Sequence, residues 1–383
     1  MNNLSQTILV KKLKNSWKEK KSNHHSMHDL CSRICSFPPS IPEYYIKKYS
    51  NPGDVVFDPW AGKGTVPFEA IRNGRMGIGN DKSPEAFILT HAKIKPVNKK
   101  SFEKYVYELE KKMNRCKITS KLTYLDKRAS VFYSKKTFEQ ILKLKKVLLN
   151  EKSHSAIFTK AIILGLLHGS TVLSFSLKCS HSYAMSPPYV QKYTKEHGLR
   201  KPYRDVINCI LEKGFRILEN EMPKQKGIAT NTDSRKLKIS SNSVDMILTS
   251  PPYFDVQTYA WANWLRLWFL NYDYKQIKKE LAESGDPEIY RNFMNESIKE
   301  LFRVLRPGSR CFIVVGDVFL GSGKYRRFVN TANFLKPSLI DAGFKIEKFV
   351  LDEIPQIKKV NSYVGKEKGI KKERIIYLIK PKN

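Results

Sequence analysis

The feature that most constrains the fold is residues 54–65, DVVFDPWAGKGT, where an apolar, β-branched run leads straight into a glycine-rich turn. Apolar residues then recur at a helical spacing over residues 66–71. A second short apolar run, residues 76–79, ends at Asn80-Asp81, and Ser83-Pro84-Glu85 has the residue types of a helix start. The order strand, turn, helix, strand predicts a βαβ unit of a parallel sheet.

The rest of the chain shows two kinds of pattern. Residues 97–227 carry long Lys-rich helical patterns, such as the one at 135–149. Strand and helix patterns alternate again after that region, in an apolar strand at 244–249, an aromatic helix at 259–268, a helix at 295–305 and strands at 311–317, 344–352 and 373–381. We therefore predict one α/β domain, with a mostly parallel sheet and helices on both faces, interrupted by a helical insertion.

These patterns also predict the boundaries of the parts. They are a basic N-terminal arm over residues 1–28, a first core segment over 29–96, a mostly helical insertion over 97–227 and a second core segment over 228–383. The arm contains His24, His25 and His28. Because no cluster of carboxylates or thiols accompanies these histidines, we expect exposed polar residues and no metal site.

The charge of the chain indicates the kind of partner. Lys and Arg total 69 against 36 Asp and Glu, which gives a formal net charge of +33. A field of this size suits a polyanion, and nucleic acid is the natural candidate. A coding bias toward Lys, Ile and Asn is the alternative explanation of the excess, so the charge supports a function without defining one.

Cysteine usage and apolar runs indicate the compartment. The six cysteines have irregular spacings, which predicts free thiols in a reducing cytoplasm. The apolar run at residues 8–10 is shorter than a secretory signal needs. The longest apolar stretch, residues 161–167, is far below the roughly 20 residues that span a bilayer, so we expect no membrane partner.

The glycine-rich turn at residues 58–65 is a candidate ligand site. Its glycines allow a ligand to approach the backbone closely, and the following helix offers unpaired N–H groups. Lys63 is followed by Gly64 rather than by Ser or Thr, so the turn is not a phosphate-binding P-loop, and it lacks the third glycine of the dinucleotide fingerprint. These residues favour a nucleoside ligand without a phosphate.

Two acids lie where they could hold such a nucleoside. Asp81 ends the next strand, roughly 20 residues after the turn, where an acid can accept both ribose hydroxyls; a helix cap is the alternative role. Asp233 lies before the strand at 244–249, where its carboxylate could accept a hydrogen bond from an adenine amino group.

The motif Ser250-Pro251-Pro252-Tyr253 follows that strand directly. The prolines fix φ and remove two N–H donors, and Pro251 forces Ser250 into an extended conformation. Such a rigid turn can present a carbonyl and the Ser250 hydroxyl to the amino group of a base. Tyr253 offers a stacking face worth about 1–3 kcal/mol, which offsets the cost of unstacking a base. A turn that merely ends the strand is the alternative.

The same tetrapeptide occurs at residues 186–189, where it follows SHSYAM rather than an apolar strand. We therefore expect the chemistry at Ser250, and at Ser186 either a helix-start turn or a base-contacting loop of the insertion.

Together these motifs resemble those of the S-adenosylmethionine-dependent, amino-directed DNA methyltransferases. The resemblance rests on DPWAGKGT, NDKSPEA and TSPPY, each at the end of a strand, and on FPPSIPEYYIKKYSNPGDVVFDP, which is similar to the family's entry segment. It covers about residues 29–95 and 228–380. The resemblance implies a Rossmann-like class I methyltransferase fold, with the insertion at 97–227 as a candidate for target recognition.

The resemblance also implies a role for individual residues. The cofactor S-adenosyl-L-methionine would contact Phe37, Asp58, Pro59, Gly62, Gly64, Thr65, Asp81 and Asp233. The target base would contact Ser250, Pro251, Pro252 and Tyr253. Because Ser in the first position of that quartet is typical of cytosine-N4 enzymes, the resemblance favours that target in double-stranded DNA. It allows a cognate restriction endonuclease as a second partner and implies no metal.

Direct transfer of the methyl group needs positioning and electrostatics rather than a nucleophile. No cysteine follows a proline, which argues against C5-cytosine chemistry through a thiolate. The alternatives are an adenine-N6 enzyme, an RNA methyltransferase and a basic DNA-binding protein that has lost the activity.

Overall fold

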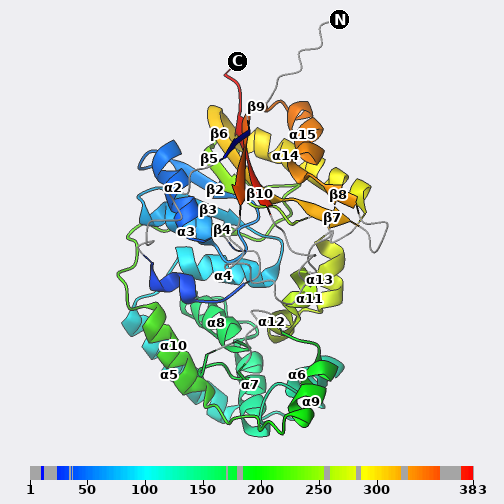
Figure 1. The fold of residues 1–383 in the computed structure, drawn as a ribbon. Helices are drawn as coiled ribbons and strands as arrows, with labels where there is room; N and C mark the ends of the chain where they lie inside the picture. The colour runs from blue at the N-terminus through cyan, green and yellow to red at the C-terminus, as the bar shows by residue number, and fades with distance from the viewer. Residues whose placement is uncertain are drawn as a thin grey trace, which may run out of the picture.

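The computed structural model describes residues 10–12, 24–33, 36, 38–169, 171–178, 184–253, 259–281, 286–320, 327–353 and 372–382. Its centre is an eight-stranded sheet in the order β1-β9-β10-β6-β5-β2-β3-β4 (Figure 1). The strands in that order are Val10–Lys12, Lys345–Glu353, Lys372–Ile379, Leu305–Gly316, Val244–Thr249, Val55–Asp58, Met76–Asn80 and Ile228–Thr230.

The order of the central strands defines the fold. Strand β10 is antiparallel to β6 and to β9, and every other neighbouring pair is parallel. From β2 the chain proceeds outward to β3 and β4 on one side, and later to β5 and β6 on the other, which is the order of a doubly wound nucleotide-binding sheet. The predicted Rossmann-like methyltransferase fold is therefore confirmed, with the short β1 added at one edge.

Strands β2 and β5 meet where the direction of winding reverses. Val56 pairs with Met246 and Phe57 with Ile247, so both strands end at the same edge of the sheet. In open α/β sheets, ligands bind in the crevice beyond the carboxyl ends of the strands at this switch point. The glycine turn after β2 and the proline turn after β5 both lie at that crevice.

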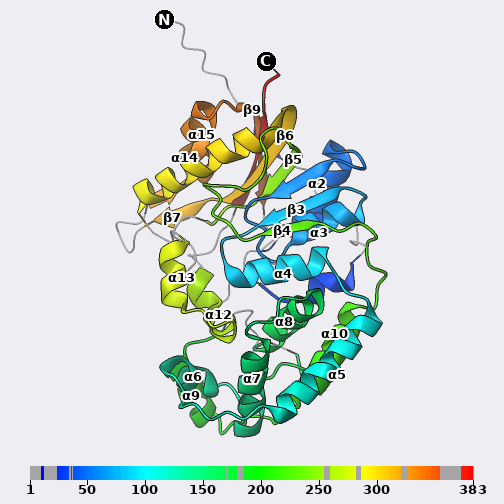
Figure 2. The ribbon, with the colours of Figure 1, turned by 180° about the vertical axis from the view of Figure 1, so that it is seen from behind.

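Alternating side chains of the strands bury the two faces of the sheet. Val56 and Met246 pack with α2 (Ser40–Tyr49) and α3 (Thr65–Arg72). Their neighbours Phe57 and Ile247 pack with α14 (Pro287–Val304) and α15 (Thr331–Asp341) on the other face (Figure 2). Because successive side chains of a strand point to opposite faces, this alternation determines which face of the sheet each residue packs against.

The region between β3 and β4 is helical. Helix α4 (Pro84–Ile94) packs against α8 (His154–Leu166), which joins this region to the sheet (Figure 1). Most of these helices begin where the side chain of a polar residue accepts a backbone N–H, as at Asn98, Thr123, Ser134, Ser153 and Asp205. The remaining helices are α5 (Lys99–Arg115), α6 (Tyr124–Ser130), α7 (Lys135–Leu148), α9 (Pro187–Glu196) and α10 (Val206–Ile217).

The structure corrects two sequence predictions. The 3₁₀ helix η1 (Ser26–Asp29) packs against the core, so the prediction of exposed histidines is wrong for His25 and His28, which are buried, and right for His24. His28 is buried because it reaches a buried carboxylate, with its Nε2 2.6 Å from Glu69 Oε1.

The aromatic helix predicted at 259–268 is two short helices. They are α11 (Tyr259–Ala262) and α12 (Trp264–Phe269), and Asn263 between them bonds back to the Tyr259 carbonyl through its backbone and its side-chain amide. Helix α13 (Tyr274–Glu280) follows, and a hairpin of β7 (Val318–Leu320) and β8 (Arg327–Val329) completes the elements.

Two simple properties of the described residues bear on the earlier predictions. Cys31, Cys116, Cys209 and Cys311 are free thiols, and the other two cysteines lie outside the described residues. No helix among the described residues combines the length and the apolarity needed to cross a bilayer.

Candidate functional site

A cleft opens at the switch point, with about 960 Å³ of space between the protein atoms and out to solvent. The glycine turn, the end of β3, the proline turn and α11 all contribute to it. It is lined by Arg33, Ser36, Asp58, Pro59, Trp60, Ala61, Gly62, Lys63, Thr65, Asn80, Asp81, Lys82, Ser83, Asp233, Ser234, Ser250, Pro252, Tyr259, Glu280, Leu281 and Phe293.

The glycine turn is held open by backbone conformations that other residues rarely adopt. Gly62 and Gly64 have φ values of +56° and +71°. A Cβ on Gly64 would lie 2.8 Å from the Thr90 Cα of α4, so this glycine serves the packing of helix against helix and does not line the cleft. Gly62, by contrast, lines the cleft, and its N–H donates to Asp81 Oδ2 at 2.9 Å.

Asp81 fixes the turn as well as facing the cleft. Its Oδ1 accepts the Ser83 N–H at 2.9 Å, so each carboxylate oxygen receives one backbone N–H. Burial raises the pKa of Asp81, and the nearby Arg33 guanidinium lowers it. The N-cap of α4 is Ser83 and not Asp81, which instead accepts the N–H of that residue. Because each Asp81 oxygen has a second lone pair, its contact with a ribose stays a prediction.

Asp58 connects the two turns. The Thr249 hydroxyl at the end of β5 donates to Asp58 Oδ1 at 2.6 Å, and the Trp60 N–H donates to the same oxygen at 3.1 Å. The side chain is buried, and burial raises the pKa of Asp58 to about 7. A buried carboxyl of this kind is well suited to a cationic ligand, which would favour its ionised form.

Asp233 lines the cleft but is strongly engaged by its own neighbour. The Arg235 guanidinium donates to both of its oxygens, from Nε at 2.9 Å and from Nη2 at 2.8 Å, and this pair lowers the pKa of Asp233. Its contact with an adenine amino group therefore stays a prediction.

Only some residues of the proline turn face the cleft. Ser250 and Pro252 line the cleft, whereas Pro251 is buried between them. The Tyr290 hydroxyl of α14 donates to the Pro252 carbonyl at 3.1 Å. Among the described residues, no hydrogen bond engages the Ser250 hydroxyl or the Pro251 carbonyl. The Ser250 hydroxyl is therefore an acceptor at the cleft that has no partner among the described residues.

Tyr253 is placed differently from the other members of the motif. Its side chain is only 8% exposed, it does not line the cleft, and its hydroxyl donates to Glu373 Oε1 of β10 at 3.0 Å. Phe37, the remaining predicted cofactor residue, lies outside the described residues. The structure thus brings most of the predicted site residues to one cleft but not Gly64, Pro251 or Tyr253.

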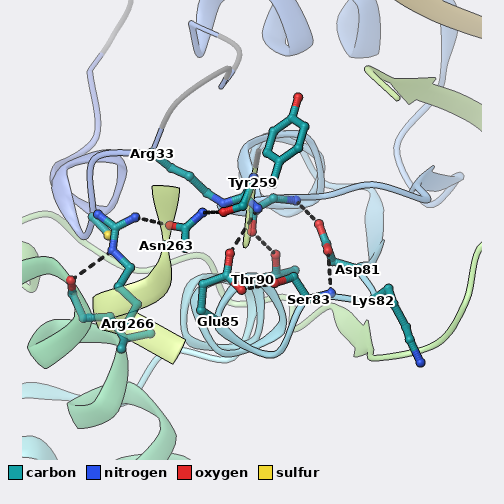
Figure 3. Close-up of polar contacts among 12 residues, drawn as sticks. Arg33, Asp81, Lys82, Ser83, Glu85, Thr90, Tyr259, Asn263 and Arg266 are labelled. Carbon is teal, nitrogen blue, oxygen red and sulfur yellow. Dashed lines mark hydrogen bonds and ion pairs between the residues drawn. The ribbon is translucent and has the colours of Figure 1, made fainter. Parts of the chain in front are cut away.

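Several residues of the cleft carried no sequence signal. Arg33 precedes α2, Tyr259 begins α11, and Glu280 ends α13, where it lies 3.4 Å from Lys82 Nζ. Figure 3 shows Arg33 and Tyr259 beside Asp81. None of these residues lies at the end of a strand of the central sheet, so no local pattern connects them with the motifs.

The second copy of the tetrapeptide is a helix start. Ser186 is the N-cap of α9 and Pro187 and Pro188 occupy its first turn, where a missing N–H costs nothing. Tyr189 is 48% exposed. Of the two roles left open by the sequence, the helix-start turn is confirmed.

A doubly wound sheet with a cleft at its switch point is the arrangement of nucleotide-binding α/β proteins, and the comparison with known families specifies the class of this chain. The chain matches the DNA methylase family over residues 3–92 and 244–383, which is more than half of its length. The chain therefore belongs to the DNA methylase family, whose methyl donor is S-adenosylmethionine.

Individual relatives match over shorter segments. A type II methyltransferase, M.MjaII of Methanocaldococcus jannaschii, is 29% identical over 149 residues, which are 37% of this chain and 27% of the relative. The orphan methyltransferase M.BamHII of Bacillus amyloliquefaciens is 39% identical over 59 residues, 15% of this chain and 22% of the relative. The chain thus spans about a quarter of the length of each of these two relatives.

Two solved structures show weaker likenesses. A Thermus thermophilus protein proposed to be a DNA modification methylase, in complex with S-adenosyl-L-methionine, is 19% identical, with a TM-score of 0.27 over 39% of this chain and 52% of that chain. An S-adenosylmethionine-dependent methyltransferase of Methanosarcina mazei is 12% identical, with a TM-score of 0.35 over 88% of this chain and 97% of that chain. The fold assignment rests on this chain's own strand order.

The residues of the cleft fit the methyl donor. Asp58, Asp81, Asp233 and Glu280 supply carboxylates for a ligand that carries a sulfonium and an ammonium group. Among the residues that the structure describes, no three His, Cys, Asp or Glu side chains gather as a metal site would require.

The pKa of Asp58 generates a prediction about cofactor binding. Below about pH 7 the free protein holds this carboxyl neutral, so binding a cation beside it should release a proton. We expect the affinity for S-adenosylmethionine to rise between pH 6 and pH 8 in the wild type, and to change much less in Asp58→Asn. Titration calorimetry at three pH values measures this. If the affinity of the variant changes with pH as much as that of the wild type, the released proton comes from another group, of which Asp81 is the first candidate.

Proposed function

We propose that this chain transfers a methyl group from S-adenosylmethionine to the exocyclic amino group of a base in DNA, with cytosine N4 as the target. The observation that carries the proposal is that the glycine turn and the proline turn line a single cleft. The donor and the acceptor nitrogen can therefore meet there without any large movement of the chain. The preference for cytosine rests on Ser250, because the adenine-directed members that the motif resembles usually carry Asp or Asn in that position.

The chain's own residues act by holding the acceptor nitrogen. When bound, S-adenosylmethionine supplies an electrophilic methyl group on its sulfonium sulfur. The Ser250 hydroxyl and a backbone carbonyl of the turn, that of Ser250 or of Pro251, can accept the two N–H bonds of an amino group, which directs the nitrogen lone pair away from the turn and toward the cleft. Once the C–N bond forms and the S–C bond breaks, the amino group loses a proton to solvent or to a nearby acceptor.

The rigid turn is important for the rate. Because Pro251 and Pro252 fix their own φ angles and Tyr290 fixes the Pro252 carbonyl, little reorganisation is needed when charge develops on the nitrogen. None of the four described cysteines lines the cleft, which supports direct transfer over a covalent thiolate intermediate.

The proposed substrate is double-stranded DNA from which the target base is everted. The net charge of +33 supports a polyanionic partner. In the helical region, residues 97–227, Lys and Arg outnumber Asp and Glu by more than two to one, which supports its proposed role in target recognition. A cognate restriction endonuclease stays a prediction.

The identity of the methylated base tests the proposal directly. DNA incubated with the protein and labelled S-adenosylmethionine should yield N4-methylcytosine after digestion to nucleosides and mass analysis. Label in N6-methyladenine would agree with an amino-directed DNA methyltransferase but would contradict cytosine N4 as its target. Label in RNA alone, or no transfer by a protein that binds the donor, would contradict the proposal itself.

Ser250→Ala removes one of the two proposed acceptors. We expect turnover to fall roughly a hundredfold, the usual effect of losing one positioned hydrogen-bonding group in a transition state. The dissociation constant for S-adenosylmethionine should stay within about threefold, because Ser250 is assigned to the base rather than to the donor. Ser186→Ala, the same change in the identical tetrapeptide, is the matched control and should leave turnover unchanged. Full activity of Ser250→Ala would remove this residue from the mechanism.

A further inference from the structure

Arg33 is a cation of the cleft to which neither the sequence nor the family match gives a role. It lies in the segment between η1 and α2, and its side chain is 9% exposed. Its Nη2 donates to Glu85 Oε1 of α4 at 3.1 Å (Figure 3). The guanidinium also lies over the Tyr259 ring, 5.8 Å from the ring centroid. The side chain is therefore held in place from two sides.

The guanidinium lies directly against the glycine turn. A Cβ built on Gly62 would be 2.9 Å from Arg33 Nη1, so the guanidinium lies where a side chain at position 62 would crowd it. Burial lowers the pKa of Arg33, but Glu85 and Asp81 outweigh it and raise the pKa, so the group is charged. Arg33 thus places a permanent positive charge at the cleft, beside Gly62 of the glycine turn.

Most of the donors of Arg33 have no hydrogen-bond partner among the residues that the structure describes. Its Nε is buried without a hydrogen-bond partner, and Nη2 makes the one hydrogen bond found among the described residues. A buried donor without a hydrogen-bond partner is destabilising, and more so when the group is charged. Both Asp81 oxygens accept backbone N–H groups, and Glu85 Oε2 accepts the Ser83 hydroxyl. The remaining donors of Arg33 have no partner among the described residues and are available to a ligand in the cleft.

We propose that Arg33 binds the α-carboxylate of S-adenosylmethionine. The proposal rests on the proposed function, because it takes that cofactor as the ligand of the cleft. The sulfonium and the ammonium groups of the donor are cations, and its ribose and adenine are neutral, so the α-carboxylate is its one anion. Guanidinium and carboxylate form charge-assisted hydrogen bonds in a fixed planar geometry, which makes arginine the preferred partner.

The two lysines of the cleft are less suited to this role. Lys63 interacts electrostatically with Cys31 and Asp29, and it lowers the pKa of the buried Lys93. Its ammonium therefore belongs to the buried cluster beneath the turn. Lys82 pairs with Glu280 across the cleft at 3.4 Å. Arg33 is the cation that combines a fixed position, burial and unused donors.

The backbone beside Arg33 is fixed by the helical side of the molecule. Arg266 of α12 donates from Nη2 to the Ser32 carbonyl at 2.7 Å and from Nε to the Leu164 carbonyl of α8 at 3.3 Å (Figure 3). Arg33 can therefore hold a ligand without a loop having to become ordered first, which keeps the entropic cost of binding low.

The test compares S-adenosylmethionine with its decarboxylated form, which keeps the sulfonium, the ammonium and the nucleoside and lacks only the carboxylate. We expect the wild type to bind the complete donor at least about tenfold more tightly, equivalent to about 1.4 kcal/mol. Arg33→Gln should lose that preference, with affinity for the decarboxylated form kept within about threefold. Arg33→Lys keeps the charge but not the planar fork and should retain part of the preference. Calorimetry gives the dissociation constants without any turnover.

Arg72→Gln is the matched control, because Arg72 also pairs with a buried carboxylate, Glu69 at 2.8 Å, but does not line the cleft. It should keep the wild-type preference. The proposal is overturned if Arg33→Gln keeps the preference, or if it weakens both ligands equally, which would mean that Arg33 only positions Asp81 and the turn. A wild type that binds neither ligand would instead contradict the proposed function.

Discussion

The hydrogen bond from the Thr249 hydroxyl to Asp58 Oδ1, 2.6 Å long and buried, joins the two halves of the site. It links the ends of β2 and β5, which are 191 residues apart in the sequence and adjacent in the sheet. The glycine turn begins at one partner of this bond and the proline turn at the other. The distance between the two turns is therefore set by the pairing of β2 with β5.

The electrostatics of the cleft follow from the same arrangement. Burial at the ends of the strands raises the pKa of Asp58 and of Asp81, and a cation beside them would lower it again. A sulfonium donor would supply such a cation. Arg33, which is charged and lies against Gly62, provides a positive charge in the same cleft. The cleft can thus orient a zwitterionic donor by charge before a base arrives.

The sequence predicted the parts of this site that local physics determines. Asp58, Asp81 and Ser250 each follow an apolar strand, and parallel strands bring their carboxyl ends together whatever the rest of the chain does. Tertiary packing alone brings three further residues to the cleft, Arg33, Tyr259 and Glu280. Packing of this kind produces no periodic pattern in the sequence, so the sequence could not predict them. The orientation of Tyr253 depends on Glu373, which lies on β10, at the other end of the chain.

Burial of polar residues was equally hard to foresee. From the sequence, His28 is expected in an exposed basic arm. In the structure it is buried, because it contacts Glu69 and the aromatic ring of Phe68. The two identical tetrapeptides show the limit most clearly, because only the apolar strand before Ser250 distinguishes a turn at the cleft from the helix start at Ser186.

In the proposed mechanism the methyl group passes directly from sulfur to nitrogen, between two turns fixed by one sheet. A donor whose methyl group is chiral by isotopic substitution, followed by configurational analysis of the methylated base, reports the stereochemical course of this transfer. We expect inversion, because a single in-line displacement reverses the configuration. Net retention would require two successive displacements through a covalent intermediate on the protein, and would contradict it.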